Sequence, residues 1–252
     1  MEIIKEGDYI LISTAGRRYF TKVEVGKSFS TKTGSIKLAE LIGKPFGIFY
    51  NSHFVFKPNL EDIILHGIKR GTQIVYPKES FFIGLKLGIK NGMKVFECGT
   101  GSGALTLIFS QLVGENGIVY TYEISEKFLK QAKKNFERFG IYNNVKFFLK
   151  DISEGIDEKD FDSAFLDVRE PKNFIKLVYD ILKPSASLGI IVPTTNQISE
   201  TLPVLKEYFS DIEVLEILQR YYKVVPERIR PEDRMVAHTG FLIFGRKFIT
   251  EF

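Results

Sequence analysis

The segment from Val95 to Leu105 constrains the fold of this chain more than any other. An apolar run ends in Glu97, glycines follow at alternate positions from 99 to 103, and an apolar helix is expected over 104–113. Glycines let the backbone pass close to a ligand, and the first turn of a helix offers unpaired N–H groups. Twenty residues beyond Gly103, a second apolar run ends in Glu123, whose carboxylate can accept both hydroxyls of a ribose. This arrangement predicts a nucleotide-type cofactor.

The glycine pattern fits two classes of cofactor. Gly99, Gly101 and Ala104 match the looser dinucleotide fingerprint, so a dehydrogenase is one alternative. Glu97 would repel a pyrophosphate, but it can meet a cationic group such as the amino group of a methionine moiety. Gly103 completes the Gly-x-Gly-x-Gly form that is expected in S-adenosylmethionine methyltransferases. The sequence therefore favours S-adenosylmethionine over a nicotinamide dinucleotide.

The composition indicates a globular protein. Its 252 residues, 44% of them hydrophobic, suffice for one large α/β domain and a small additional one. No stretch approaches about 18 consecutive apolar residues, and no signal peptide is apparent, so we expect a cytoplasmic protein without membrane contact. Cys98 is the single cysteine, which excludes an intrachain disulfide or a cysteine-rich zinc site. No metal is expected.

Two regions differ in their pattern. Residues 1–66 have short β-branched and aromatic runs, which predict a small β-rich domain, with a helix over 60–69. From residue 81 strands alternate with helices, which predicts a parallel sheet covered on both faces. The expected strands of this second region are 95–97, 118–122, 145–149, 161–166, 188–192, 212–219 and 240–244, and its helices are 104–113, 126–139, 171–182 and 197–209. Ligands of such sheets bind beyond the carboxyl ends of the strands, where Glu97, Glu123, Asp151 and Asp167 are expected.

Basic residues are clustered, although the net charge is only +4. The clusters are Arg17-Arg18, Lys69-Arg70, and Lys223 with Arg228, Arg230 and Arg234. A solvated face and an RNA contact are equal alternatives for them.

Four motifs point to one family. They are the segment Lys69–Lys78, the loop from Glu97 to Thr106, Leu166-Asp167 followed by Glu170-Pro171, and the segment His238–Leu242. With them the chain resembles, nearly end to end, the tRNA adenine-N1 methyltransferases that act on T-loop position 58, in their single-gene archaeal and bacterial form. The resemblance implies a Rossmann-like class I methyltransferase sheet with a small N-terminal β-rich domain, S-adenosylmethionine as cofactor, tRNA as substrate and a homotetramer. It divides the chain into a tRNA-contacting domain over 1–66, a connecting segment over 67–80 with substrate and cofactor contacts, and a methyltransferase domain over 81–252.

The resemblance also assigns the cofactor site. Glu123 would hold the ribose hydroxyls, Phe128 would lie nearby, and Asp151 with Ile152 would take the adenine. The residues expected to line the methionine and ribose are Gly99, Gly101, Ser102, Gly103, Ala104 and Leu105.

Asp167 is the candidate catalytic group. Adenine N1 is a poor nucleophile because its lone pair is conjugated with the N6 amine, and methylation makes the ring cationic. A carboxylate that accepts a hydrogen bond from N6 offsets both problems. Capping of the helix that begins at Pro171 is the structural alternative for Asp167.

The remaining candidates concern the substrate. Because N1 lies on the Watson–Crick edge, the base must be extracted, and Tyr76 is expected to stack on it or close over the cofactor, unless Tyr76-Pro77 is only a turn. His238 could carry a proton, and the alternative is a packed, hydrogen-bonded histidine with a structural role. The substrate-contacting set is Gln73, Tyr76, Arg169, Pro193, Thr194, Asn196, Arg228, Arg230 and His238.

A non-catalytic RNA-binding subunit and a methyltransferase acting on a small molecule or a protein are the alternative functions, and the sequence leaves open whether adenine 57 is methylated as well.

Overall fold

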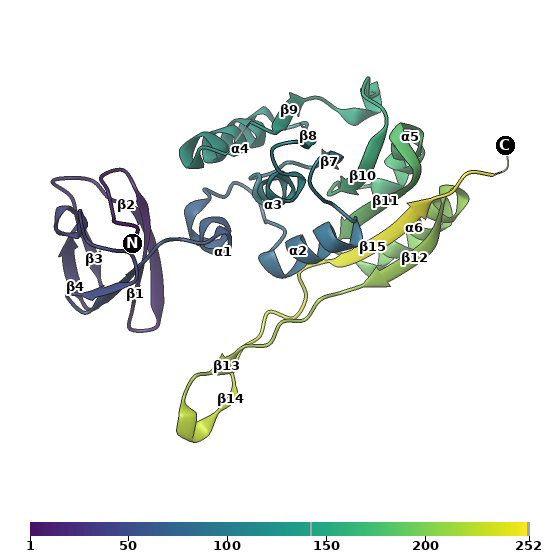
Figure 1. The fold of residues 1–252 in the computed structure, drawn as a ribbon. Helices are drawn as coiled ribbons and strands as arrows, with labels where there is room; N and C mark the ends of the chain where they lie inside the picture. The colour runs from purple at the N-terminus through teal and green to yellow at the C-terminus, as the bar shows by residue number, and fades with distance from the viewer. Residues whose placement is uncertain (142, 251–252) are drawn as a thin grey trace. The chain divides into compact units, whose positions relative to one another are not determined.

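The computed structural model describes residues 1–141 and 143–250. The chain divides into two compact units, Met1–Ile68 and Lys69–Phe252 (Figure 1). Each unit has its own hydrophobic core, and each is described separately below.

The first unit is built on an antiparallel sheet with the strand order β2-β1-β6-β5. Alternation along these strands directs Ile10, Ile12 and Val55 into the core, while Phe54 and Phe56 on the opposite side stay exposed. The four strands are β1 (Tyr9–Thr14), β2 (Arg17–Lys22), β5 (Ile48–Tyr50) and β6 (His53–Phe56), and a separate hairpin is formed by β3 (Ser28–Thr31) and β4 (Gly34–Lys37).

The helix expected over 60–69 forms over 60–67, as a short α-helical turn continued by a π-helical one. Asn59 and Asp62 form a reciprocal capping box that begins α1 (Leu60–Asp62). The chain then continues as a π-helical turn, Ile63–Gly67, which ends where Ile68 becomes extended.

The second unit contains a seven-stranded sheet with the order β12-β15-β11-β10-β7-β8-β9. Strands β11, β10, β7, β8 and β9 are parallel to one another, and β15 runs antiparallel to both β11 and β12. The predicted α/β fold is therefore confirmed. The strands are β7 (Lys94–Cys98), β8 (Ile118–Glu123), β9 (Val145–Leu149), β10 (Phe161–Leu166), β11 (Leu182–Val192), β12 (Phe209–Leu215) and β15 (Phe241–Lys247).

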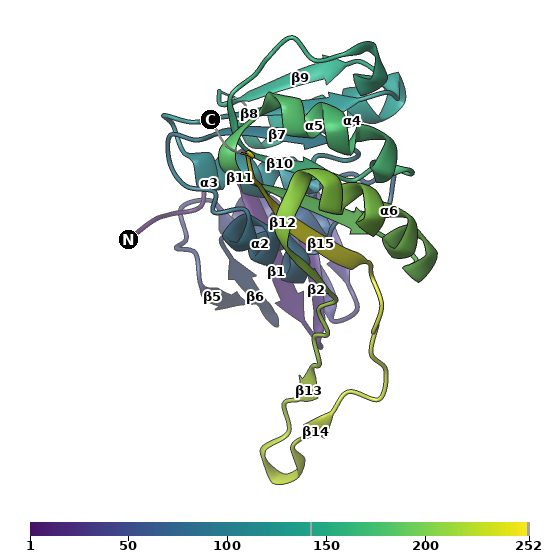
Figure 2. The same ribbon diagram turned by 90° about the vertical axis from the view of Figure 1, so that its right-hand side faces the viewer.

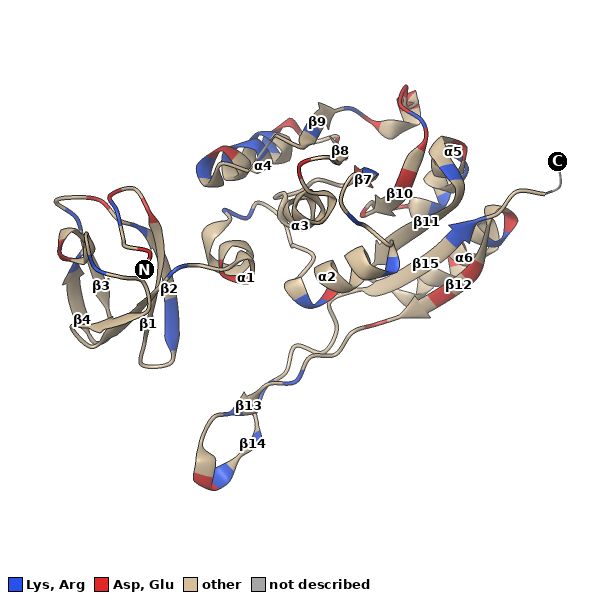
Figure 3. Cartoon of the chain, in the orientation of Figure 1, with Lys and Arg blue, Asp and Glu red and all other residues tan. Residues whose placement is uncertain are grey.

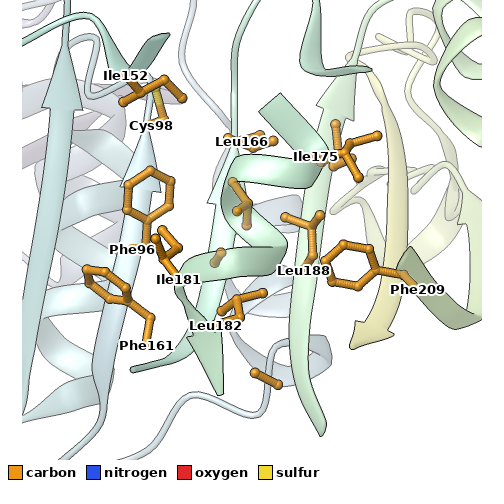
Figure 4. Packing of buried hydrophobic residues seen from close by; sticks show 14 of the residues in the cluster. Phe96, Cys98, Ile152, Phe161, Leu166, Ile175, Ile181, Leu182, Leu188 and Phe209 are labelled. Carbon is orange, nitrogen blue, oxygen red and sulfur yellow. The ribbon is translucent and has the colours of Figure 1, made fainter. Parts of the chain in front are cut away.

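Helices cover both faces of this sheet (Figure 2). On one face, α2 (Pro77–Lys86) and α3 (Ala104–Val113) pack over Val95, Phe165 and Phe244. The other face carries α5 (Ile175–Ile181) and α6 (Thr195–Tyr208), whose buried residues join Phe96, Leu166 and Leu188 in one cluster (Figure 4). The buried residues of α4 (Glu126–Phe139) include Phe136, which lies edge-on to Phe147 of β9.

Several boundaries differ from the expected ones. Helix α2 overlaps the end of the connecting segment predicted over 67–80 and continues to Lys86, where no helix was expected, and Pro77 fits its first turn. Strand β11 begins at Leu182 rather than 188, and Ser185 within it has a left-handed φ of 65°. The predicted helix over 171–182 accordingly begins as a 3-10 turn, Pro171–Phe174, and ends at Ile181.

Between β12 and β15 the chain forms a long extended hairpin, residues 216–240, here called the arm. Its strands β13 (Tyr222–Lys223) and β14 (Arg230–Pro231) pair with each other, and both views show the arm projecting from the sheet (Figures 1 and 2). No described helix is long and apolar enough to span a membrane.

Candidate active site

A cavity of about 350 Å³ lies at the carboxyl ends of the parallel strands of the second unit, where ligands of open α/β sheets bind. The segment 72–75, the glycine loop after β7, the end of β8 and the loop after β10 form its walls. The site residues predicted from the sequence that line it are Gln73, Gly99, Gly101, Ser102, Ala104, Leu105, Glu123, Phe128, Asp167 and Arg169.

The glycine loop brings β7 and β10 into close contact. Gly99 has a φ of +100°, and a Cβ atom at this position would lie 2.1 Å from the carbonyl oxygen of Asp167. The Asp167 amide donates to the carbonyl oxygen of Cys98 (2.8 Å), and the Gly99 amide donates to that of Tyr122 (2.9 Å). Gly103, with φ +81°, is the N-cap of α3. Only glycine at 99 permits this approach of the two strand ends.

Glu123 is held in place by backbone amides. Its Oε2 accepts from the amide of Gly101 and its Oε1 accepts from that of Ser125, both at 2.9 Å. A carboxylate oxygen can accept more than one hydrogen bond, so the hydroxyls of a ribose can still bind here.

Glu97 is buried beneath the glycine loop and is only partly satisfied. The Thr106 hydroxyl donates to its Oε2 (2.6 Å), while no described residue donates to its Oε1. Burial raises the pKa of Glu97 to about 8 against the opposing hydrogen bonds of Thr106 and Thr121, and the carboxylates of Asp167 and Glu123 add to the increase. A buried, unpaired carboxyl oxygen costs free energy, and a cationic amino group would satisfy it.

Asp167 lies in the cavity wall directly after β10. No described residue donates a hydrogen bond to its carboxylate, and the 3-10 turn at Pro171 has Glu170 as its N-cap. The side chain is reached by solvent from the cavity, yet surrounding protein atoms desolvate it. This desolvation, with the charge of Glu123, raises the pKa of Asp167 to about 6. Asp167 therefore presents a free hydrogen-bond acceptor to whatever occupies the cavity.

The segment before α2 is tied to the glycine loop. The Ser102 hydroxyl accepts from the amide of Gly71 (3.2 Å), and the buried Asn135 of α4 donates to the carbonyl oxygens of Lys69 and Ser102 (3.0 and 2.9 Å). Gln73 donates to the Tyr76 hydroxyl (3.0 Å). Tyr76 itself is the N-cap of α2 and is outside the cavity lining.

Lys78, directly after this segment, holds the two roots of the arm. Its ammonium donates to the Ile217 carbonyl (2.6 Å) and to the Thr239 hydroxyl (2.8 Å), and it forms an ion pair with Glu79. The Thr239 hydroxyl also donates to Glu79, which is 1% exposed and has a second carboxyl oxygen without a described partner.

Comparison with known proteins identifies the family. Residues 54–239 match the family model described as the tRNA methyltransferase complex GCD14 subunit. The chain belongs to this GCD14 family.

Individual relatives extend the match over the whole chain. The tRNA (adenine(57)-N(1)/adenine(58)-N(1))-methyltransferase TrmI of Methanocaldococcus jannaschii is 32% identical, covering 94% of each chain. The crystal structure of the tRNA (m1A58) methyltransferase TrmI from Aquifex aeolicus has a TM-score of 0.93 and 44% identity over 99% of this chain and 100% of that one. A structure from Thermotoga maritima described as a SAM-dependent O-methyltransferase has a TM-score of 0.93 and 41% identity, covering 98% of this chain and 96% of that one.

Several site residues predicted from the sequence lie outside the cavity lining. The Asp151 carboxylate accepts from the amide of Ser153 (2.9 Å) at a 3-10 turn, and Ile152 is buried in the core. Thr194 is the N-cap of α6, Pro193 precedes it, and Asn196 lies in the first turn of the helix. Arg228 and Arg230 are exposed on the arm. Figure 3 shows basic positions in blue along this arm.

His238 joins the arm root to the loop before α6. Its ring nitrogens lie 3.1 Å from Oε1 of Glu216 and 2.9 Å from the carbonyl oxygen of Pro193. These two acceptors, Glu216 first, raise the pKa of His238. The histidine is thus hydrogen-bonded through both nitrogens when it is protonated, and it lies outside the cavity lining.

The sequence did not predict the roles of Thr106 and Asn135 in this GCD14-family chain. Thr106 hydrogen-bonds to Glu97, and Asn135 hydrogen-bonds to the backbone of the loops around the cavity. Asn135 had a signal in the sequence, because it lies on the same face of α4 as Leu129, Ala132 and Phe136 and is polar. A buried amide on an apolar helix face must find partners, and here they are two loop carbonyls. Thr106 had no such signal, since threonine is common in the first turn of a helix.

Proposed function

We propose that the protein transfers a methyl group from S-adenosylmethionine to N1 of adenine 58 in the tRNA T loop. The observation that carries the proposal is the Asp167 carboxylate, which has no described hydrogen-bond donor and lies in the wall of a cavity formed by the glycine loop. The GCD14 relatives named for this reaction support it, and one of them is named for adenine 57 as well.

The polar groups in and beneath the cavity fit S-adenosylmethionine, which when bound supplies the methyl group on a sulfonium. Glu123 would accept from the ribose hydroxyls, and the backbone from Gly99 to Leu105 would follow the methionine and ribose. The unpaired Oε1 of Glu97 would accept from the amino group. Asp151 and Ile152 are the proposed partners of the adenine.

Asp167 would act on the target base. Accepting a hydrogen bond from N6 increases the electron density at N1 and stabilises the positive charge that develops on the ring. Gln73 and Tyr76, joined by their hydrogen bond, would position the extracted base, and Arg169 with Pro193, Thr194 and Asn196 would contact the RNA around it. His238 would keep the loop at Pro193 in place.

We also propose a homotetramer in which the first unit helps to hold tRNA. The arm supports an assembled form, because apolar side chains on an isolated extended hairpin are otherwise left in water. Its exposed apolar residues are Leu218, Tyr221, Tyr222, Val224, Val225, Ile229, Met235 and Val236. Activity on tRNA implies a cytoplasmic location.

Nucleoside mass spectrometry tests the proposed function. Unmodified tRNA is incubated with the protein and S-adenosylmethionine, digested, and analysed by position. We expect 1-methyladenosine at position 58, and a transcript with guanosine instead of adenosine at that position should accept no methyl group there. Methylation on a ribose or base oxygen would instead favour the activity in the name of the Thermotoga maritima structure. No methylation of any tRNA would support the non-catalytic alternative, which the presence of both the glycine loop and Asp167 makes the weaker one.

Cofactor binding should release a proton from Glu97. With a pKa of about 8, about nine-tenths of this carboxyl is protonated at pH 7 in the free protein. An ammonium beside it favours the ionised form, so we expect the release of approximately one proton per site at pH 7. Calorimetry in two buffers that differ in ionisation enthalpy measures this number.

The matched control is Glu97→Gln, which should bind with almost no proton release. The pKa of Glu97 in the folded protein is raised above its ordinary 4.5, so its protonated form contributes to the free energy of unfolding. This contribution is fully present below about pH 4.5 and is lost as pH rises through about 8. The free wild-type protein should therefore lose stability over this range more steeply than the Gln variant. Equal proton release by both proteins would contradict the assignment.

Replacing Arg228 and Arg230 together with glutamine should weaken tRNA binding and flatten its dependence on salt. Each lost phosphate contact lowers the slope of log affinity against log salt by roughly 0.7–0.9. Fluorescence anisotropy with labelled tRNA at several salt concentrations measures both effects, and the affinity for S-adenosylmethionine should be unchanged.

Lys159 and Lys183 provide a control pair at the amino ends of β10 and β11, the edge of the sheet opposite the cavity. Glutamine at both should leave the slope unchanged. An unchanged slope in the arginine variant would instead assign Arg228 and Arg230 to a subunit contact or to solvent, which sedimentation of the same variant would separate.

A further inference from the structure

One face of the sheet in the first unit carries an unusual set of side chains. The register of β2, β1, β6 and β5 places opposite residues on the same side, so the members of this face follow from the pairing. We call it the aromatic face. Its strand residues are Tyr9, Leu11, Ser13, Arg18, Phe20, Lys22, Phe49, Phe54 and Phe56.

Three of its phenyl rings are exposed and contiguous. Phe49, Phe54 and Phe56 have 63%, 48% and 40% of their surface accessible. The rings of Phe54 and Phe56 are nearly parallel, 7° apart, with centroids separated by 6.1 Å, and Phe49 lies across from Phe54 at 4.7 Å. The core of the first unit does not need these rings, since Ile10, Ile12 and Val55 fill it from the opposite side of the sheet.

The charges on this face have one sign. Arg18 and Lys22 are exposed, and none of the nine strand residues on the face is acidic. Asp62 of α1 approaches one guanidinium nitrogen of Arg18 at 3.5 Å, which leaves other donors of that group available. Exposed aromatic rings with flanking cations, and with no acidic residue among the strand residues of the face, are the combination that binds single-stranded nucleic acids, because bases stack on the rings and phosphates are attracted by the positive charge.

We propose that the aromatic face stacks unpaired bases of RNA on Phe49, Phe54 and Phe56. The position of two of these rings at alternate residues of an inner strand in a four-stranded antiparallel sheet is the arrangement by which sheet-based RNA-binding modules stack two or three bases. Arg18 and Lys22 bind the phosphates that follow. The identity of the RNA as tRNA rests on the proposed function, whereas the stacking itself does not.

Binding of tRNA by full-length variants tests the proposal. Phe54→Ala with Phe56→Ala should weaken binding about tenfold or more, on the scale of losing one or two stacked bases. Phe54→Tyr with Phe56→Tyr keeps the rings and should restore wild-type affinity. Phe54→Leu with Phe56→Leu keeps apolar surface without rings and should bind nearly as weakly as the alanine pair.

Controls separate stacking from other causes. Phe81→Ala removes a ring of equal exposure, 48%, from α2 and should leave affinity unchanged. Circular dichroism and sedimentation should show the same fold and assembly for all variants. Wild-type affinity in the alanine or the leucine pair would overturn the proposal, as would a change of assembly in the alanine pair, which would assign the face to a second copy of the chain.

The outcome is distinguishable from a failure of the proposed function. Ring-dependent RNA binding without methylation at adenine 58 would retain the stacking face and reject the proposed reaction. Methylation at adenine 58 with tRNA binding that does not depend on the rings would support the proposed reaction and reject the stacking face.

Discussion

Replacing Asp167 with alanine is expected to lower the rate of methyl transfer to tRNA by about a hundredfold or more, on the scale of losing a preorganised electrostatic partner of the transition state. The affinity for S-adenosylmethionine should change by only a few fold, because Glu97, Glu123 and the glycine loop remain. Single-turnover kinetics with saturating cofactor measures the rate, and calorimetry measures the affinity.

Asp167→Asn is the sharper variant, since it keeps the shape of the side chain and removes its charge. The pH dependence gives a second readout. With its pKa raised to about 6, the wild-type carboxyl becomes protonated as pH falls through that value, so kcat/KM should decline below about pH 6. The asparagine variant should lack this decline. Near-normal turnover in both variants would show that Asp167 has only a structural role at the end of β10.

Replacing Gly99 with alanine should destabilise the fold and abolish cofactor binding together. Position 99 has a φ of +100°, and the new Cβ would lie 2.1 Å from the carbonyl oxygen and 2.9 Å from the carbonyl carbon of Asp167. Backbone atoms cannot move aside as a flexible side chain can, so the ends of β7 and β10 must separate. We expect a loss of about 3 kcal/mol or more in the free energy of unfolding, measured by urea denaturation.

Gly140 is the matched control for this experiment. It has a positive φ of +68° at the end of α4, but a Cβ there would meet no atom within 4 Å. Gly140→Ala should therefore cost only about 1 kcal/mol from backbone strain and should leave S-adenosylmethionine affinity unchanged. Equal destabilisation by the two variants would mean that strain alone, and not the contact with Asp167, explains the requirement for glycine at 99.

The sequence predicted the parts of the fold that have a strong local signal. Helix α4 has the expected bounds, 126–139, because the side-chain cap Ser125 and the left-handed Gly140 mark its ends. The strand ends at Glu97, Glu123 and Asp167 were also located, since apolar runs followed by an acidic residue are easily recognised. Ten of the eighteen described residues that line the cavity were on the predicted list, and of these Gln73, Phe128 and Arg169 came from the family resemblance rather than from a local pattern.

Elements that depend on distant contacts were not predicted. Helix α2 packs on α3, and the early part of β11 pairs with residues near Phe161, so neither boundary follows from its own residues. The roles of Thr106 and Asn135 depend on which groups they meet after folding. The β13–β14 pair of the arm has no apolar core of its own, and the sequence marked this segment only by its cluster of basic residues.

The hydrogen bonds of Lys78 link the arm mechanically to the segment that carries Tyr76. Because a single ammonium group holds Ile217 on one side of the arm and Thr239 on the other, the two sides cannot shift independently of the first turn of α2. A partner that binds the arm therefore acts on a segment whose two roots are tied to the chain two residues after Tyr76, so we expect its binding and the position of the first turn of α2 to influence each other.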